Sequence, residues 1–286
     1  MKTFRILGLA LVVTGLLFAG CKKTEDEDEE EEGTVSLDVS APTEPQNKNV
    51  LLEEFTGNNC QYCPDGHKRV NELIAANSGR LIGINIHEGS LAQLYKTEFG
   101  PALYQAAKPS GIPAGTINRI LFDGDTAMAL NRGYFSYRAN QVLAQPACAN
   151  IAAKASINKS TRELTVAVAV YYTGTPTGST NMINVAITQD SVWGSQKDPQ
   201  NLYPEAWNSD HSKYCHMHML RHLVTGQWGD AITPATGKQI KKEYKYTIPA
   251  SISNVDMVLE NLNVIAFVCE GHANVINVCE APLTIR

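Results

Sequence analysis

The first half of the chain, over residues 49–145, alternates between strand-like and helix-like patterns of apolar positions. Residues 50–55 and 81–86 are largely apolar runs, which is the pattern of buried strands. Between these runs, apolar side chains recur at helical spacing over residues 63–76. A helical stretch over 91–107, a strand over 116–122 and a helix over 133–144 are expected to follow. This alternation predicts an α/β layer structure.

The second half of the chain loses the helical period, and short strand-like segments take over. The expected strands cover residues 151–157, 163–172, 182–188, 244–248, 264–269 and 275–280. Residues 193–237 are rich in Trp, Tyr, His and Pro and are expected to form loops. We therefore predict an α/β domain over residues 49–146, followed by an immunoglobulin-like β-sandwich domain over residues 147–286.

The first 20 residues have the layout of a secretory signal. Lys2 and Arg5 precede an apolar run over residues 6–18, which is too short to span a bilayer. The run ends in Leu-Phe-Ala-Gly before Cys21, which resembles the lipobox of bacterial lipoproteins. Residues 1–20 would then be removed, and Cys21 would carry the lipid that holds the protein on a membrane. A plain signal peptide followed by a chance cysteine is the alternative.

Consecutive acidic residues occupy positions 25–32. Such a run repels itself and cannot form a core, so we expect residues 21–48 to be a disordered tether. It also resembles the signal that sends some lipoproteins of the Bacteroidota to the outer face of the outer membrane, although a plain spacer is the alternative. Without residues 1–32, the 24 basic and 29 acidic residues fall by four and eight to 20 and 21. A nearly neutral body argues against nucleic acid as a partner.

Six of the seven cysteines remain once Cys21 is assigned to lipid. Cys60 and Cys63 are two residues apart, between a predicted strand and a predicted helix. The other four allow three pairings, and they are Cys148, Cys215, Cys269 and Cys279. The last two flank a predicted hairpin, which favours a bond between them.

The spacing of Cys60 and Cys63 suits thiol–disulfide exchange. A helix N-terminus presents unpaired N–H groups and a partial positive charge, which stabilise the first sulfur as a thiolate. Cys60 would therefore be the nucleophile, and Cys63 would resolve the mixed disulfide. Gln61 and Tyr62, between them, would set the potential and contact the substrate. A permanent staple is the alternative, although so short a loop gains little loop-closure entropy.

Ile112-Pro113 lies about fifty residues further on, which resembles the place where a thioredoxin-like fold keeps its cis proline, and it supplies the second part of the predicted site. A cis bond here would turn the backbone of Ile112 outward, where it could pair with an extended substrate. The order of strand, Cys-x-x-Cys, helix, strand and Ile-Pro strand resembles the thioredoxin superfamily. Residues 51–57, together with Cys63-Pro64, are similar to the Omp28-related outer membrane proteins.

The resemblance implies a thioredoxin-like domain and a β-rich domain in an outer membrane lipoprotein. Asn59 stands where thioredoxin has a tryptophan, and Gln61-Tyr62 is closer to the disulfide isomerases. The first hypothesis is an oxidoreductase or isomerase that acts on the thiols or disulfides of exported proteins. The second is a non-catalytic adhesin or binding protein that uses the same domain as a scaffold. Neither requires a cofactor, and no pattern indicates the oligomeric state.

Other metal-binding or charged side chains have simpler interpretations. A zinc site at the cysteine pair would need His67 and His87 as ligands, whereas we expect His67, like Arg119, to face solvent. A denser group follows at His211, Cys215, His216, Met217, His218 and His222. On a strand, His216 and His218 would share a face, a spacing that could serve copper or zinc. Because nothing completes a ligand set, we expect no metal there, a disulfide at Cys215 and histidines bonded to the backbone.

Overall fold

The computed structural model describes residues 37–176 and 178–286, and the two predicted apolar runs lie at the centre of its main sheet. Strand β1 (Val50–Thr56) and strand β2 (Leu81–His87) are buried at every position and pair in parallel. Helix α1 (Cys63–Ala76) connects them, with Pro64 in its first turn, where the missing N–H leaves no helical bond unmade.

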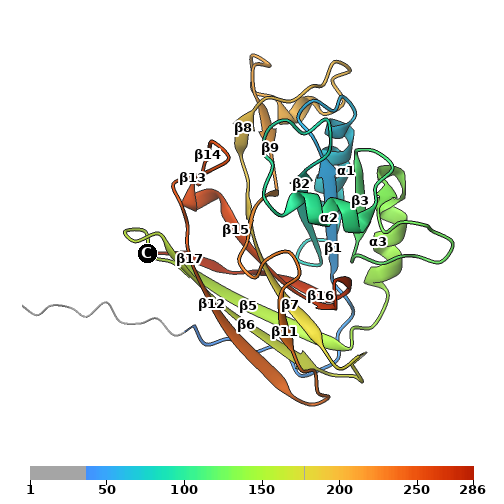
Figure 1. Cartoon of the computed structure of the whole chain (residues 1–286), viewed down its shortest axis with the longest axis vertical. Helices are drawn as coiled ribbons and strands as arrows, with labels where there is room; N and C mark the ends of the chain where they lie inside the picture. Colours follow the sequence, from blue (N-terminus) through green and yellow to red (C-terminus); the bar gives the residue numbers. More distant parts are fainter. Residues whose placement is uncertain (1–36, 177) are drawn as a thin grey trace, which may run out of the picture. The chain divides into compact units, whose positions relative to one another are not determined.

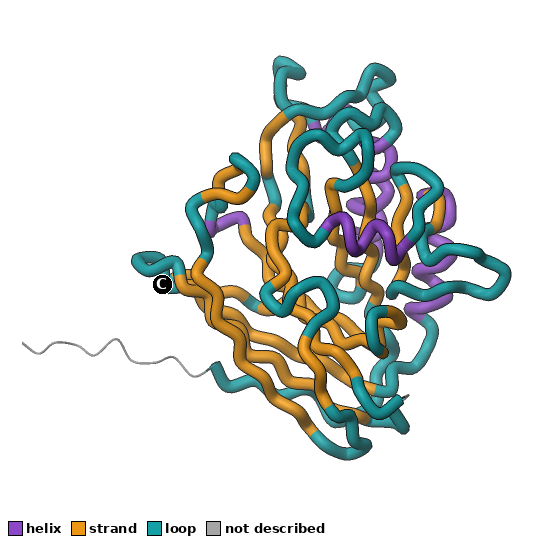
Figure 2. Tube along the Cα trace, in the orientation of Figure 1, coloured by secondary structure: helices purple, strands orange, loops and turns teal. Residues whose placement is uncertain are grey.

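Most of the regular elements are strands, in a mixed α/β arrangement (Figure 2). The first half continues with α2 (Gly100–Ala107), β3 (Ala114–Ile117), β4 (Leu130–Asn131), a 3-10 turn (Arg132–Tyr134) and α3 (Phe135–Leu143). The second half begins with β5 (Ala149–Ile157), β6 (Glu163–Tyr172), β7 (Asn181–Gln189), β8 (Val192–Gly194), a 3-10 turn (Pro204–Ala206), β9 (Tyr214–His216), β10 (Met219–Leu223) and β11 (Asp230–Ile232). It ends with β12 (Gln239–Thr247), β13 (Ser251–Ile252), β14 (Val255–Asp256), a 3-10 turn (Leu259–Asn261), β15 (Leu262–Glu270), β16 (Ala273–Ala281) and β17 (Leu283–Ile285).

The strands are arranged in two large sheets and two small ones (Figure 1). The nine-stranded sheet has the order β16-β15-β7-β10-β2-β1-β3-β4, with β11 paired to β7, and the four-stranded sheet has the order β12-β6-β5-β17. An apolar core lies between the four-stranded sheet and strands β7, β15 and β16 of the nine-stranded sheet. Val168, Val185 and Val264 are among its members. The next residues along β7 and β15, Ala186 and Ile265, point to the opposite face and pack in the core that includes α2.

One sheet runs through both halves of the chain because β10 lies between β2 and β7. Asn85 of β2 connects this strand to the two residues that precede β10. Its backbone N–H donates to the carbonyl of His218 at 2.7 Å, and its side chain donates to the carbonyl of Met217 at 2.9 Å. Residues 37–286 accordingly form one compact unit. The predicted boundary at residue 146 lies inside this unit, and the division into thioredoxin-like and immunoglobulin-like domains stays a prediction.

Only the end of the helical stretch predicted over residues 91–107 is helical. The side-chain oxygen of Asn58 accepts hydrogen bonds from the backbone N–H groups of Gln93 and Leu94 at 2.9 and 3.0 Å. These bonds hold the preceding segment as a loop, and α2 begins only at Gly100.

The strand predicted over residues 116–122 stops at Ile117. Asn118 and Arg119 both have φ near +50°, which interrupts an extended backbone. The side chain of Asn118 compensates for the lost pairing, because its oxygen accepts from the N–H of Leu51 at 2.8 Å.

The predicted tether over residues 21–48 is too long at its C-terminal end. Val39 and Ala41 are buried against Ala167 and Ala169 of β6, so the segment from residue 37 belongs to the folded unit. The predicted signal peptide, Cys21 and the acidic run lie outside the described residues.

Strands β15 and β16 form the predicted hairpin, but the predicted bond between Cys269 and Cys279 is wrong. The register places Cys279 opposite Ala266, and Cys269 opposite Val275. Cys269 packs in the core that includes α2, whereas Cys279 packs on the core between the large sheets. The two thiols therefore face opposite sides of the sheet. Cys148 and Cys215 are also free thiols, so the disulfide expected at Cys215 is wrong as well.

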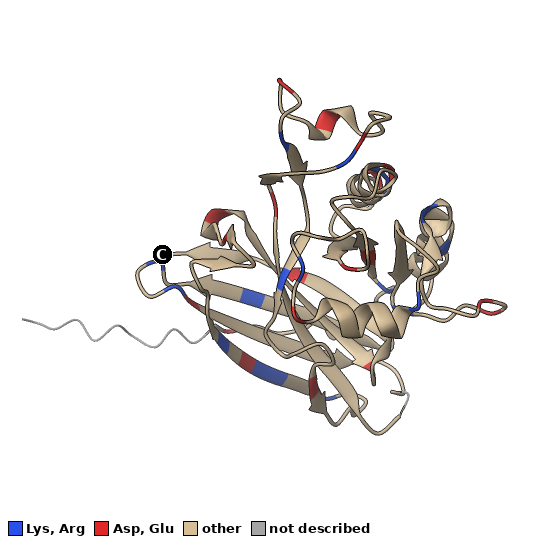
Figure 3. Ribbon diagram, turned by 45° about the horizontal axis from the view of Figure 1, so that its top comes forward, with Lys and Arg blue, Asp and Glu red and all other residues tan. Residues whose placement is uncertain are grey.

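Charged side chains mark the free edge of the four-stranded sheet (Figure 3). Within the described part of the chain, strand β12 pairs along its length with β6 alone, and it carries exposed Lys241, Lys242, Glu243 and Lys245. Such charges disfavour pairing with another strand at this edge. Across residues 37–176 and 178–286, no helix combines the length and apolar character needed to cross a membrane.

Candidate functional site

Cys60 and Cys63 form a disulfide at the start of helix α1. Cys63 is the first residue of the helix, and Cys60 lies in the turn after β1, where its N–H donates to the carbonyl of Gly57 at 3.0 Å. The Ile112–Pro113 bond is cis, as predicted. The carbonyl oxygen of Ile112 lies 3.6 Å from Sγ of Cys60. The fold thus brings the two predicted parts of the site into contact.

The disulfide is shielded from solvent. Cys60 is 1% exposed and Cys63 is 0% exposed. Residues 195–197, which we call the cover segment, are bonded to the turn before the helix: the Gln196 side chain donates to the carbonyl of Cys60 at 3.0 Å, and the N–H of Lys197 donates to the carbonyl of Asn58 at 2.8 Å. No local pattern predicts this segment, because it lies about 136 residues from the cysteines and contains no motif.

Exposed apolar side chains lie on the residues around the shielded disulfide. Tyr62 is 44% exposed, and Leu91 and Leu94 are 43% and 46% exposed. The loop that carries the leucines is bonded to the cysteine turn, because the carbonyl of Leu91 accepts from the N–H of Asn59 at 3.0 Å. Of the two residues between the cysteines, Gln61 is half-buried, so Tyr62 is the more accessible.

Glu54 is a buried carboxyl group that sequence analysis also missed. Neither of its carboxyl oxygens has a hydrogen-bond partner within the part of the chain that the structure describes, and burial raises its pKa well above the usual value. A Cβ atom added to Gly66 would overlap Glu54 Oε1 and lie 2.9 Å from Cβ of Pro113. The carboxyl group and the proline ring therefore both meet the first turn of α1. An acidic residue inside a buried strand was the available signal.

His67 is buried, so its predicted exposure is wrong. Its two ring nitrogens lie 2.7 Å from Oγ1 of Thr56 and 2.9 Å from the hydroxyl of Tyr214. The ring of His216 lies 6.1 Å from that of His67 and 5.3 Å from that of His87, measured between centroids. Burial lowers the pKa of His67 to about 3 and that of His216 to about 4. These rings are therefore neutral at pH 7.

Cys60 and Cys63 cannot act as thiolate ligands of zinc while their two sulfurs are bonded to each other. Within the described ranges, no three side chains from His, Cys, Asp and Glu are grouped to hold a metal ion.

The dense group of His, Cys and Met over residues 211–222 is divided by the fold. His211 stacks on Trp207, His218 lies 3.3 Å from the carboxylate of Asp190, His222 stacks on Tyr246, and His216 joins the buried rings. His218 has a φ of +53°, so the expected strand alternation ends before it. Cys215 and Met217 remain in contact, with 3.8 Å between their sulfurs.

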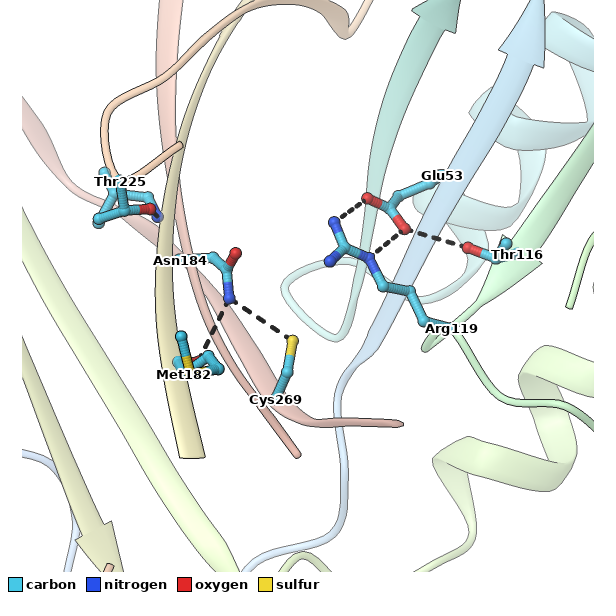
Figure 4. Close-up of polar contacts among 8 residues, drawn as sticks. Glu53, Thr116, Arg119, Met182, Asn184, Thr225 and Cys269 are labelled. Carbon is cyan, nitrogen blue, oxygen red and sulfur yellow. Dashed lines mark hydrogen bonds and ion pairs between the residues drawn. The ribbon is translucent and has the colours of Figure 1, made fainter. Parts of the chain in front are cut away.

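Arg119 is buried rather than solvated. Its guanidinium donates two hydrogen bonds, of 2.8 and 2.7 Å, to the carboxylate of Glu53, which also accepts one from Thr116 at 3.1 Å (Figure 4). Burial opposes the charge, but Glu53 raises the pKa of Arg119 overall. In the same view, the Asn184 side chain donates to the sulfur of Cys269 at 3.6 Å. These groups have structural partners, so they are poor candidates for a substrate clamp.

Comparison with known proteins places the chain in a family. Residues 101–284 match the family described as outer membrane protein Omp28. The chain belongs to the Omp28 family. Its place is therefore the outer membrane of the cell envelope, as predicted. The matched residues do not include Cys60 and Cys63, so family membership by itself does not assign a redox activity.

Several solved structures match this Omp28-family protein, among them the following three. HBP35 of Porphyromonas gingivalis has a TM-score of 0.62 at 19% identity, over 83% of this chain and 76% of that one, which shows a shared fold. A protein of Agrobacterium tumefaciens has a TM-score of 0.48 at 12% identity, over 83% of this chain and 95% of that one. A domain of the outer membrane lipoprotein Omp28 from Porphyromonas gingivalis has a TM-score of 0.33 at 21% identity, over 49% of this chain and 91% of that one. No curated protein matches the sequence.

Proposed function

We propose that this Omp28-family protein is a membrane-anchored thiol–disulfide oxidoreductase or isomerase that acts on exported proteins. In this proposal residues 49–146 are a thioredoxin-like module, the later strands form a β-sandwich, and lipid on Cys21 holds the protein at the membrane. One observation carries the proposal: the Cys60–Cys63 disulfide lies at the N-terminus of α1, with the sulfur of Cys60 against the carbonyl of Ile112.

The exchange follows from this placement. A substrate thiolate attacks the sulfur of Cys60, and Cys63 leaves as a thiolate that takes up a proton. A second substrate thiolate then attacks the mixed disulfide and releases Cys60. Two substrate thiols are oxidised to a disulfide while Cys60 and Cys63 are reduced, and the reverse sequence reduces a substrate. The helix N-terminus favours the thiolate of Cys60 in either direction.

Two neighbouring features support this chemistry. The Glu54 carboxyl lies against the first turn of α1, in a protonated form that burial favours, so it is placed to exchange a proton near Cys63. The exposed Tyr62, Leu91 and Leu94 place apolar surface beside the cysteine turn, which suits an unfolded substrate segment.

The second candidate function is a non-catalytic surface lipoprotein, and the burial of Cys60 favours it. A disulfide that is 1% exposed cannot be attacked until the residues over it move. In this alternative the bond is a permanent staple, and a different surface binds an envelope or host partner. Cys60→Ser would then leave partner binding intact.

Alkylation of the reduced protein separates the two candidates. Reduced full-length protein is treated with iodoacetamide across a range of pH, and modification of Cys60 is followed by mass spectrometry. We expect Cys60 to react well below the pH at which an ordinary thiol, with a pKa of about 8.5, becomes reactive. Cys148, a half-buried free thiol in the same chain, is the internal control.

Activity is measured on the same preparation by insulin reduction and by refolding of scrambled ribonuclease. A Cys63→Ser variant should accumulate mixed disulfides between Cys60 and its substrates. If Cys60 reacts like Cys148 and both activities are missing, the redox proposal fails and the binding function is favoured.

A further inference from the structure

A pair of sulfur atoms lies on strand β9 and just beyond it, outside the redox site. The thiol of Cys215 donates to Sδ of Met217 across 3.8 Å. The backbone N–H of Ser191 donates to the same Sδ at 3.4 Å, which fixes the position of the thioether. Both side chains are half-buried, so an ion can reach them, and Cys215 forms no disulfide.

The distance between these sulfurs fits one metal ion held by both. If each sulfur lies about 2.3 Å from the ion, as thiolates do in zinc sites, a separation of 3.8 Å corresponds to an angle of about 110° at the ion. This is the angle of a tetrahedral ion, so the two sulfurs can occupy two of its positions and leave the others to solvent. Thiolate and thioether are soft ligands, which select Cu(I), zinc and iron–sulfur clusters. Structural zinc sites are closed by four protein ligands and iron–sulfur clusters are usually held by four cysteines, so one thiolate with one thioether favours Cu(I).

An indole ring is available beside the thiol. Trp193 of β8 is the direct cross-strand partner of Cys215 and is 49% exposed. Facing residues of an antiparallel pair have Cβ atoms about 4.5–5.5 Å apart, so the indole can lie over an ion bound at the thiol. A ring face attracts a cation. The carboxylate of Asp190 adds negative charge near Cys215.

We propose that Cys215 and Met217 bind a soft monovalent metal ion, Cu(I), with Trp193 beside it. On binding, the Cys215 S–H bond is replaced by a sulfur–metal bond and the proton passes to solvent. No electron is transferred, so the step needs no oxidant or reductant. The site shares no residue with the cysteine pair of the proposed function and does not depend on it.

Silver ion tests the site because Ag(I) has the same charge and ligand preference as Cu(I) and does not change oxidation state during the titration. Full-length protein with Cys21→Ser, which removes a thiol outside the described residues, is titrated by calorimetry with the Cys60–Cys63 disulfide intact. We expect one site that binds silver more strongly than the lone thiols of Cys148 and Cys279 do. Binding of Cu(I) itself is then measured by competition with a chromophoric chelator, and we expect the same stoichiometry.

Single variants assign the ligands. Cys215→Ser should abolish the strong site, and Met217→Leu should weaken it at least about tenfold, because even outer-shell residues of metal sites contribute about 10–100-fold. Trp193→Phe should remove the change in tryptophan fluorescence that accompanies binding. Cys148→Ser replaces another half-buried free thiol and should leave the affinity unchanged.

An unchanged affinity in either Cys215→Ser or Met217→Leu overturns the proposal, because the ion would then be held elsewhere or by a lone thiol. A further measurement keeps both ligands in place, so it does not depend on whether the variants fold. In this protein, labelled with ¹³C-methyl methionine, the Met217 methyl signal must shift when Ag(I) is added. A Cys60→Ser/Cys63→Ser variant should keep the silver site, so failure of the redox proposal and failure of the metal proposal remain distinguishable.

Discussion

Burial decides the charge of the side chains beside the disulfide. It raises the pKa of Glu54 well above the usual value, which favours the protonated carboxyl group, and it lowers the pKa of His67 to about 3, so the imidazole is neutral at pH 7. No full positive charge from these groups is then available to stabilise a thiolate at Cys60. The partial charge of the α1 N-terminus must supply that stabilisation, together with the helical N–H groups.

The raised pKa of Glu54 predicts how the stability of the protein depends on pH. Its pKa is raised on folding, so its contribution to stability is complete below the usual glutamate pKa of about 4.3 and is lost as pH rises above it. Glu54→Gln should remove this loss. Relative to the variant, the wild type should lose up to about 1.4 kcal/mol of unfolding free energy per pH unit until Glu54 ionises in the folded state.

Urea unfolding of both oxidised proteins from pH 4 to pH 8 measures this difference. Parallel dependences of stability on pH would show that Glu54 is ionised in the folded protein.

Gly66 is a second residue on which the site depends. A methyl group there would press on the Glu54 carboxyl and on the Pro113 ring, both buried. Gly66→Ala should therefore lower the unfolding free energy by about 1–3 kcal/mol, the usual cost of overpacking. Gly111→Ala is the matched control, because that position is exposed and its added Cβ would meet nothing within 4 Å. Equal stabilities of the two variants would contradict the close packing at α1.

Among the elements, the hairpin of β8 and β9 and the loop between its strands are bonded to the turn and the helix that carry the disulfide. The cover segment follows β8, and Gln196 donates hydrogen bonds to the carbonyls of Cys60 and Gly57 at 3.0 and 3.4 Å. Tyr214 of β9 is bonded to His67 of α1. One hairpin is thus attached to the helix that begins at the redox pair.

Loss of the Gln196 side chain should expose the disulfide. Gln196→Ala removes the hydrogen bonds from this side chain to the turn. A hydrogen bond contributes a net free energy of about 0.5–1.5 kcal/mol. If the cover segment opens more easily by this amount, dithiothreitol should reduce the disulfide up to about tenfold faster. Gln93→Ala, at an exposed position in the adjacent loop, is the control. An unchanged rate in Gln196→Ala would show that the cover segment does not limit access.

The elements that could be predicted from the sequence are those fixed by residues close together in the chain. Strands β1, β2 and β6 could be predicted almost to the residue because their apolar runs are local. Strand β10 could not, because it is five residues long, lies in a stretch expected to form loops, and is fixed by pairing with β2 and β7. The cysteine pair was found from its spacing, and the Ile-Pro bond from its place in the order of elements that resembles a thioredoxin-like fold. The cover segment required contacts between distant parts of the chain, which no local pattern encodes.

For the folded unit as a whole, the shared sheet links the two halves through several buried contacts. Strand β10 pairs with β2, and the Arg119 guanidinium lies 5.1 Å from the ring centroid of Phe267 in β15. Phe55 of β1 and Ile265 of β15 belong to the same apolar core. Separation of residues 49–146 from the rest would expose this core and the edge of β2, so the first half should not be stable alone.

Two probes can test this cooperativity because the halves carry different signals. The three α-helices of the described residues, α1, α2 and α3, lie before residue 147, whereas Trp193, Trp207 and Trp228 lie after it. During urea unfolding of the oxidised full-length protein, circular dichroism at helical wavelengths therefore reports mainly the first half, and tryptophan fluorescence reports the second. A single cooperative unit requires the two transitions to coincide in midpoint and slope. If the helical signal is lost at a different urea concentration from the fluorescence signal, the halves unfold separately and the domain boundary predicted at residue 146 is real.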